Sequence, residues 1–484
     1  MYEVMQNPPL LSYYLAGVGK LWGWAEVTLH LSLLIPAIFL ILGIYALASQ
    51  FCKQPFWAAL AAITAPVFLI TSTTLMCETF MLCFWVWAVV FWRRGLQEKK
   101  PFLLGGAALL MTLSALSKYY GISLIPLLFL YTLLYCRGLR RPLLFLLIPV
   151  AILVGYHWFT YALYGRGLLL DAASYATEVN TPALIKLFIG LAFLGGCLLN
   201  SIFYVPLLWK RNYILAGLFS GIIIFMILCA LKEFGMVPLV NNGGYKWEII
   251  GQTTLFILAG LNIIALTLAD IYEMRDADSV LLGLWVIGTC AFAFLINWSV
   301  NGRSILPLTP AVMILLWRRL EWLGRGQWFQ VGWKPLAIYV PAACLALMLS
   351  WADYQLAISA KSAAAEITAR FQGGPGKVWI DGHWGFQYYM MAHGFSPLDA
   401  RNSRLYDGDL VAMARLNPND DPANYPKFTL VEQLEFPSCS WLAVLNSGCG
   451  AGFYADVYGS LPFVFTRVPR EKYYIFRFSP FSSR

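Results

Sequence analysis

Long apolar segments recur along most of this chain, and they constrain its fold more than any other feature. A helix needs about 20 predominantly apolar residues to cross about 30 Å of hydrocarbon. The composition agrees with repeated crossing, because 60% of the residues are hydrophobic and only 12% are charged. We therefore predict an α-helical polytopic membrane protein, embedded in a lipid bilayer, with about twelve spans at 29–49, 56–73, 79–92, 102–117, 121–136, 143–163, 182–209, 213–231, 253–272, 279–297, 305–317 and 335–351.

Basic residues are clustered in alternate connections between these segments, whereas the other connections carry single charges. Cytoplasmic loops of membrane proteins carry such an excess of Lys and Arg, so the pattern orients both ends of the chain to the outer side. The pattern also accounts for the net charge of +9 without a nucleic-acid partner. The clusters are Lys53, "FWRRGLQEKKP", "CRGLRRP", Lys210 with Arg211, Arg275 and "WRRLEWLGRGQWFQVGWK".

Hydropathy falls after residue 351, and predicted strands such as "GKVWIDG" and "YYIFRF" alternate with turn-forming stretches such as "NPNDDPANYP". We predict three parts: 1–28, the remnant of a first outer loop with a juxtamembrane helix; 29–351, the transmembrane domain; and 352–484, a small extracytoplasmic α/β domain. Because disulfides persist outside the cytoplasm, we expect one between Cys439 and Cys449. The other eight cysteines lie singly in apolar segments, where each is expected to be a small buried hydrophobe.

Ionisable residues at the outer ends of the spans are the candidates for chemistry, because a membrane protein retains few of them without a function. Glu78, in "TTLMCETFML", is either a functional carboxylate or a solvated loop acid. Lys118, in "LSALSKYYGIS", either binds an anion or snorkels to the headgroups. Arg303, in "NWSVNGRSILPLTP", opens a helix and carries a guanidinium suited to a phosphate. His30 begins a span and either donates to an anion or is satisfied by the backbone.

Weaker signals lie in two longer outer loops and in the C-terminal part. Arg166 and Lys246 suit an amphiphilic phosphorylated ligand, but they suit any interfacial loop as well. Asp381, His383 and Trp384, in "WIDGHWGFQYY", either contact an acceptor glycan or pack on the membrane domain. No nucleotide-binding, metalloprotease or serine hydrolase motif is found. The four His are dispersed, so a divalent metal is not favoured and no other cofactor is expected.

Four stretches together resemble one family: "NPPLLSYYLAGVGKLWG" (7–23), "APVFLITSTTLMCETFMLCFWVWAVVFW" (65–92), "GGAALLMTLSALSKYYGISLIPLLFLY" (105–131) and "NWSVNGRSILPLTPAVMILL" (297–316). They are similar to glycosyltransferase family 39, the protein-mannosyltransferase-like membrane enzymes of bacteria, which have the GT-C fold and include the lipid A aminoarabinose transferases. The shared pattern is a Pro-Pro-Leu segment, an acid in the next outer loop, a Lys-Tyr pair and an Arg before a Leu-Pro step.

The resemblance implies an inverting transfer of a sugar from a polyprenyl-phosphate donor to a lipid, glycan or protein acceptor. It places this reaction on the outer face of the bacterial inner membrane, with the C-terminal domain in the periplasm. Lys118 and Arg303 would then stabilise the departing phosphate, and a carboxylate would deprotonate the acceptor hydroxyl. The matching positions are Pro8 and Pro9 for the loop motif, Glu78 for the acid, Lys118 and Tyr119 for the Lys-Tyr pair, and Arg303 for the late Arg.

The N-terminal region departs from the family pattern. Asn7 stands where His commonly precedes the double Pro, and Ser304 stands where Tyr often follows the Arg. The family also has a first helix and a leading catalytic acid before the Pro-Pro segment. We therefore expect the natural protein to start upstream of Met1, with a thirteenth span and that acid; Glu3 is the nearby acid that would otherwise substitute.

Three other functions share some of these features. A transporter or flippase for a lipid-linked sugar would also have many spans and few charges, but it would show two related halves with broken helices. A polysaccharide polymerase or ligase would carry several arginines in a late outer loop, whereas the loop at 232–252 has two lysines and no arginine. A chain without its catalytic acid could also be an inactive protein whose C-terminal domain binds glycan.

Overall fold

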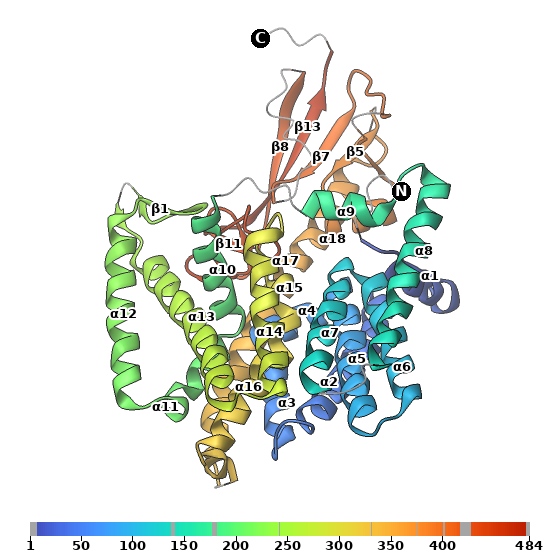
Figure 1. The fold of residues 1–484 in the computed structure, drawn as a ribbon. Coiled ribbons are helices and arrows are strands. Elements are labelled where there is room, and N and C mark those ends of the chain that lie inside the picture. The colour runs from blue at the N-terminus through green and yellow to red at the C-terminus, as the bar shows by residue number, and fades with distance from the viewer. Residues whose placement is uncertain are drawn as a thin grey trace.

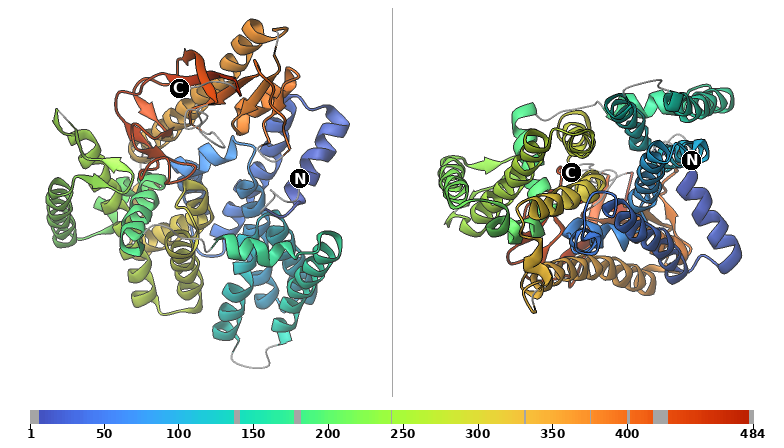
Figure 2. Two further views of the ribbon diagram at one scale, coloured as in Figure 1. Left: turned by 90° about the horizontal axis from the view of Figure 1, so that it is seen from above. Right: turned by 60° about the horizontal axis from the view of Figure 1, so that its bottom comes forward.

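The computed structural model describes residues 7–136, 141–176, 182–241, 243–330, 332–374, 376–399, 402–416 and 427–480. Its helices form a bundle, and a β-sheet stands on one end of that bundle (Figure 1). Figures 1 and 2 agree that helices from the first third of the chain and those from its middle lie on opposite flanks, with later helices between them. The predicted helical membrane architecture with a strand-containing C-terminal region is therefore confirmed.

Seven helices among the described residues are long and apolar enough to cross a membrane, judged by length and composition. Two further pairs are bent, by 66° at α3 (Pro55–Ile63) and α4 (Pro66–Ser72), and by 71° at α10 (Ala183–Cys197) and η3–α11 (Leu199–Leu208), which gives nine if each pair is one span. The seven are α2 (Glu26–Ala48), α5 (Cys77–Gln97), η2–α8 (Arg141–Tyr164), α12 (Arg211–Ala230), α13 (Trp247–Met274), α14 with its π turn (Ala277–Ile296) and α17 (Leu336–Phe371).

The predicted count of twelve spans is not confirmed. Three predicted spans correspond to shorter helices: α6 (Pro101–Ser117), η1–α7 (Tyr119–Tyr135) and α16 (Thr309–Trp322). At 1.5 Å per residue even 17 residues rise only about 26 Å, which is short of the hydrocarbon thickness. The remaining helices and turns are α1 (Leu10–Trp22), α9 (Leu168–Ala176), α15 (Gly302–Ile305), η5 (Leu306–Leu308), η6 (Gly326–Gln330) and α18 (Trp384–Ala392).

The local sequence explains the bend between α3 and α4. Pro66 is the first residue of α4, and Ala65 before it is extended, with φ −70° and ψ 132°. Proline cannot donate a helical hydrogen bond and disfavours the helical conformation of the residue before it, so the helix breaks there. The short α4 then ends at Ser72, and the turn that follows leads into α5, whose first turn carries Glu78.

The elements beside the predicted basic connections lie at the end of the bundle away from the sheet. Figure 1 places α3, α11 and the lower end of α16 there. The same connections are held by ion pairs, including Arg93 with Asp278 at 2.6 Å and Arg319 with Glu273 at 2.7 Å. The sheet and these described basic connections thus lie at opposite ends of the bundle (Figure 1).

The C-terminal region contains a five-stranded mixed sheet in the order β6-β5-β7-β13-β8. β5 pairs in parallel with β6 and β7, and β13 pairs antiparallel with β7 and β8. The last turns of α17, together with α18, pack on this sheet and share its hydrophobic core. The strands are β5 (Val378–Asp381), β6 (Ser396–Pro397), β7 (Leu410–Ala414), β8 (Phe428–Phe436) and β13 (Glu471–Phe478).

Short two-stranded hairpins complete the fold. Those between α12 and α13 are β1 (Glu233–Phe234) with β2 (Val237–Pro238), and β3 (Val240–Asn241) with β4 (Gly244–Tyr245). Those of the C-terminal segment are β10 (Leu445–Asn446) with β11 (Ala451–Gly452), and β12 (Val464–Phe465) with β9 (Leu442–Ala443).

The predicted domain boundary at 351/352 falls inside α17, which continues without a break to Phe371. The C-terminal region also divides between two cores. The sheet has a core of its own, whereas residues 439–468 contribute side chains such as Leu442, Phe453 and Leu461 to the core of the helix bundle. The segment 439–468 is therefore an integral part of the helical body.

The predicted disulfide is wrong in this structure, because Cys439 and Cys449 are both free and buried. Both side chains belong to the core shared by residues 439–468 and the helices, and the Cys449 thiol lies 3.9 Å from the carbonyl of Arg467. Burial raises the pKa of the Cys449 thiol, which disfavours the thiolate that disulfide formation requires. Packing holds this segment without a covalent link.

Candidate functional site

A buried carboxylate lies behind two cations at the sheet end of the bundle. Glu78 is only 2% exposed, and its Oε1 lies 2.8 Å from Lys118 Nζ and 3.8 Å from Arg303 Nη1. Lys118 and Arg303 keep 22% and 25% of their side-chain surface exposed. The three charges sum to +1, and the exposed part of the cluster belongs to the two cations, so its accessible surface is positive.

Local structure places each member of this cluster. Glu78 lies in the first turn of α5, where a negative charge is favourable near the helix N-terminus. Lys118 ends α6 in an extended conformation, and the turn that follows packs back on that helix. A side chain at Gly121 would lie 2.5 Å from the backbone of Ser114, so only glycine permits this close return. Arg303 lies in α15, which Asn301 caps by accepting a hydrogen bond from Ser304 N at 2.8 Å.

Arg303 also contacts the segment 439–468, which lies between β8 and β13 in the chain, and the residue that precedes α5. Its Nη2 donates to the carbonyl of Tyr454 at 3.2 Å, and its Nη1 lies 3.0 Å from Met76 Sδ. Its Nε and the second oxygen of Glu78 have no hydrogen-bond partner among the described residues. Buried polar atoms without partners are uncommon, so the cluster has hydrogen-bonding capacity left for a ligand.

The loop that carries Arg303 is clamped by residues 453–456. Gly302 N donates to the carbonyl of Phe453 at 2.8 Å, and Asp456 N donates to the carbonyl of Val300 at 2.9 Å. Ser299 Oγ donates to Asp456 Oδ1 at 2.7 Å, and burial raises the pKa of Asp456. The position of Arg303 therefore depends on a segment about 150 residues further along the chain.

A cavity of about 380 Å³ adjoins the cluster, between the start of α2, α17, α18 and the segment at Tyr454. Met76 and Tyr454, which both contact Arg303, also line this cavity. Tyr454 Oη lies 2.9 Å from both carboxylate oxygens of Asp353. Burial, together with the Asp353 charge, raises the pKa of Tyr454 well above its usual value, so its hydroxyl remains a donor.

The other predicted ligand-binding residues lie in various places. His30 lines the cavity, and its Nδ1 lies 3.0 Å from the carbonyl of Thr73. The hydroxyl of Tyr119 lies 3.3 Å from that of Tyr156, on α8. Asn7 is exposed before Pro8. Glu3 lies outside the described residues.

Two further residues that we predicted to bind the ligand, Arg166 and Lys246, lie in other parts of the structure. Arg166 pairs with Asp171 at 3.4 Å near the start of α9, with both side chains exposed. Lys246 precedes α13 and accepts hydrogen bonds through its carbonyl from the first turn of that helix. The structure thus brings Glu78, Lys118 and Arg303 together and places His30 in the wall of the adjoining cavity, whereas Arg166 pairs with Asp171 and Lys246 precedes α13.

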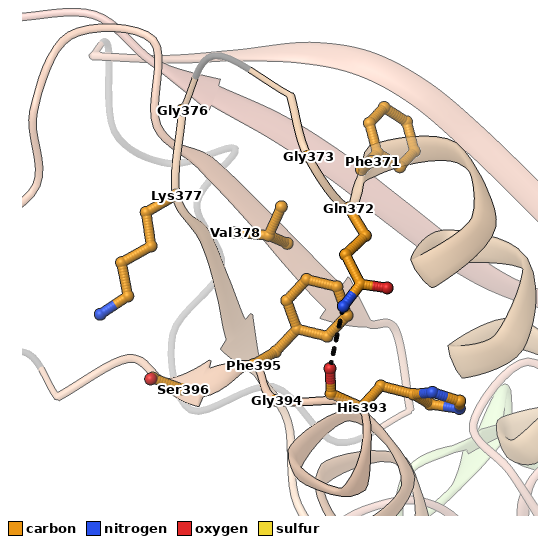
Figure 3. Close-up of a pocket in the computed structure, with 10 residues that line it drawn as sticks. All are labelled: Phe371, Gln372, Gly373, Gly376, Lys377, Val378, His393, Gly394, Phe395 and Ser396. Carbon is orange, nitrogen blue, oxygen red and sulfur yellow. Dashed lines mark hydrogen bonds between the residues drawn. The ribbon is translucent and has the colours of Figure 1, made fainter.

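A second cavity, of about 230 Å³, lies between the end of α17 and the sheet (Figure 3). Lys377 and His393 lie on opposite sides of it, and Gln372 Nε2 donates to the carbonyl of His393 at 3.4 Å. The Lys377 ammonium is 3.7 Å from the centre of the Trp379 ring. None of the described residues that line it is acidic, so these residues supply no proton acceptor of the carboxylate type.

Asp353 and Tyr454 are the site residues that sequence reasoning did not identify. The sequence does contain a signal for Asp353, because this carboxylate lies inside a long helix, α17, that is apolar at its start and polar at its end. Tyr454, in "GAGFYADVYG", carries no such signal. Among the described residues, no group of three or more His, Cys, Asp or Glu side chains could hold a metal ion.

Fold and site together define a polytopic helical membrane protein with a cluster of two cations and a buried carboxylate beside a cavity. Residues 6–159 match the family described as dolichyl-phosphate-mannose-protein mannosyltransferase. This match confirms the resemblance to protein-mannosyltransferase-like membrane glycosyltransferases. No curated protein sequence matches the chain.

Solved structures show more distant likenesses. ArnT from Cupriavidus metallidurans, bound to undecaprenyl phosphate, is 14% identical, with 85% of this chain and 83% of that chain covered and a TM-score of 0.44. The oligosaccharyltransferase AglB from Archaeoglobus fulgidus, with an inhibitory peptide and a dolichol-phosphate, is 12% identical, with 85% and 61% covered and a TM-score of 0.44. The arabinofuranosyltransferase AftD from Mycobacteria is 12% identical, with 96% and 36% covered and a TM-score of 0.35.

Proposed function

We propose that this protein transfers a sugar from a polyprenyl-phosphate donor to a lipid, glycan or protein acceptor on the outer face of the bacterial inner membrane. The observation that carries this proposal is the buried Glu78 carboxylate in contact with the partly exposed cations Lys118 and Arg303. The family match over residues 6–159, which includes Glu78 and Lys118, supports the same chemistry. The sheet domain then lies in the periplasm, on the side away from the basic connections.

The cations act on the leaving group. An acceptor hydroxyl attacks the anomeric carbon from the face opposite the phosphate, so the configuration inverts. The bond between the anomeric carbon and the phosphate oxygen breaks, and its electron pair leaves with the polyprenyl phosphate. Lys118 and Arg303 stabilise that charge because they are fixed before the reaction and need not reorganise. The guanidinium also holds two phosphate oxygens at once.

Glu78 acts in this scheme as a positioning residue. Its side chain is only 2% exposed and its Oε1 contacts both cations, so an acceptor hydroxyl has little access to it. Its carboxylate fixes the two cations at one distance from each other and offsets their mutual repulsion. This role differs from that of a carboxylate that deprotonates the acceptor, for which Glu78 was one candidate from the sequence.

A transfer assay tests the proposal. The full-length protein, purified in detergent, would be incubated with labelled polyprenyl-phosphate sugars and membrane lipid extract, with and without EDTA. We expect labelled product with at least one donor, and we expect it to form in the presence of EDTA as well. The rate of transfer should fall at least a hundredfold in Lys118→Ala and in Arg303→Ala. Arg166→Ala, which removes an exposed cation paired elsewhere, is the control and should retain activity. Donor-dependent flux into vesicles without any transfer would support a flippase instead.

A further inference from the structure

The cavity beside the cation cluster has a composition suited to a ligand rather than to packing. Its volume of about 380 Å³ lies within the range of about 300–1,000 Å³ that is usual for small-molecule sites. Most of its wall is apolar or aromatic, and a few polar groups converge on it. The aromatic members are Trp384, Phe386, Tyr388, Tyr389, Tyr454 and Tyr473, and the ionisable ones besides tyrosine are Glu26, His30, Asp353 and His383.

The cavity and the cations share a wall. Met76 and Tyr454 line the cavity, and both contact Arg303. Tyr454 links the two directly, because its carbonyl accepts from Arg303 and its hydroxyl donates to Asp353. A group bound in the cavity therefore lies next to a phosphate held by Lys118 and Arg303.

Among the described residues, Asp353 is the carboxylate of this cavity that a ligand can use. Glu26 is already paired with Lys361 at 3.0 Å, and Glu78 is buried behind its two cations. Asp353 forms no ion pair among the described residues, and its hydrogen-bond partner is the hydroxyl of Tyr454. A carboxylate has about four lone-pair sites, so this bond leaves room to accept a proton from a substrate hydroxyl.

Trp384 is held in the cavity wall by a strained backbone. Its φ is +54°, in the left-handed region that bulky residues rarely occupy. Such strain persists only where the surroundings enforce it, and it is frequent at ligand clamps. The indole ring lies 5.6 Å from the ring of Tyr454 and 6.4 Å from that of Tyr458, and the residue remains 45% exposed. The fold thus orients a broad aromatic face that packing alone does not bury.

We propose that this cavity is the acceptor site, that it takes a saccharide ring stacked on Trp384, and that Asp353 accepts the proton of the attacking hydroxyl. This proposal rests on the proposed function. A saccharide fits both parts of the wall, because its C–H face packs on aromatic rings while its hydroxyl groups bond to carboxylate and imidazole. A lipid tail would instead cover the remaining hydrogen-bonding positions of Asp353 and of the His30 and His383 imidazoles, which is costly.

The chemical step needs no group other than the donor, the acceptor and the side chains of this site. The acceptor oxygen forms its bond to the anomeric carbon of the donor as its proton passes to an oxygen of Asp353. The bond from that carbon to the phosphate oxygen breaks, and the electron pair leaves on the phosphate beside Lys118 and Arg303. Tyr454, which donates to Asp353, keeps the carboxylate in place during the transfer.

The test compares acceptor use with donor-side binding in the full-length protein. Transfer from the labelled polyprenyl-phosphate sugar would be measured against increasing concentrations of lipid extract. Thermal stabilisation by undecaprenyl phosphate alone would report binding at the cations. The variants are Trp384→Ala and Asp353→Asn, and the control is Trp441→Ala, because Trp441 is 44% exposed in the same region but does not line the cavity.

We expect Trp384→Ala to raise the half-saturating acceptor concentration at least tenfold with little change in kcat. Asp353→Asn should lower kcat by a hundredfold or more, and all variants should keep the stabilisation by undecaprenyl phosphate. Wild-type acceptor kinetics in both variants would overturn the acceptor site and leave the proposed function intact. Absence of both transfer and stabilisation in the wild type would overturn the proposed function and this inference with it.

Discussion

Lys118 Nζ lies 2.8 Å from Glu78 Oε1, and the Glu78 side chain is only 2% exposed. The pair joins the C-terminal end of α6 to the first turn of α5. A buried ion pair adds little net stability as a whole, but removal of one partner leaves the other charge buried and unpaired. The pair therefore makes the geometry of the cation cluster and the stability of the bundle depend on the same contact.

Glu78→Gln should destabilise the protein and impair transfer together. Loss of the carboxylate leaves Lys118 and Arg303 to repel each other, and breaking a buried pair costs roughly 3–5 kcal/mol. We expect a lower melting temperature in detergent and a transfer rate reduced at least tenfold.

Glu98→Gln is the matched control for that measurement. Glu98 pairs with Lys100 at 2.6 Å, but both side chains are exposed, and exposed pairs contribute about 0–1 kcal/mol. Equal melting temperatures for the two variants would show that the Glu78 pair is not buried as the structure has it.

Arg303→Lys should weaken binding of undecaprenyl phosphate although it keeps the charge. The guanidinium reaches the Tyr454 carbonyl at 3.2 Å and Glu78 at 3.8 Å, and a single ammonium cannot bond to both and to a phosphate in the same geometry. We expect at least a tenfold weaker affinity, measured by concentration-dependent thermal stabilisation. Unchanged affinity in Arg303→Lys would mean that only the charge matters at this position.

Much of the helical body could be predicted from hydropathy. The predicted apolar segments correspond to helices, and the alternation of basic connections predicted which helix ends share a side. That alternation put Glu78, Lys118 and Arg303 on one face before any contact was known. Span length was harder to predict, because proline breaks such as the one at Pro66 and short helices such as α6 are apolar without being long.

Contacts made by the C-terminal segment could not be predicted in the same way. The segment 439–468 has turn-rich, mixed composition, which is typical of a separate domain, yet its apolar residues pack into the helix bundle. Tyr454 and Asp456 reach Arg303 and its loop only through this packing. When a site residue contacts a distant segment of the chain, the contact depends on tertiary structure. Local sequence periodicity does not predict it.

Asp456→Asn should loosen the Arg303 loop without touching a ligand. Asp456 Oδ1 accepts from Ser299 Oγ at 2.7 Å in a buried site, and hydrogen bonds to charged groups contribute about 1.5–3 kcal/mol. We expect a severalfold weaker affinity for undecaprenyl phosphate and a smaller effect on acceptor use. Asp399→Asn, which alters an exposed hydrogen bond to Asn402, should change neither. Equal effects on donor-side and acceptor-side kinetics would indicate general destabilisation rather than positioning.

Glu471 should make stability fall as pH rises. Burial raises the pKa of Glu471 to about 7 from its ordinary value of 4.5, while a hydrogen bond from Asn446 and the charge of Arg415 oppose the rise. The folded state therefore holds this proton more tightly than the unfolded state, so stability decreases between about pH 4.5 and pH 7 and then levels off. Glu471→Gln keeps a neutral side chain at every pH and should flatten this part of the profile of melting temperature against pH. Glu435→Gln, at an exposed residue 3.5 Å from Lys472, should leave the wild-type slope in place. If Glu471→Gln and the wild type lose the same number of degrees between pH 5 and pH 8, Glu471 is ionised in the folded protein throughout that range.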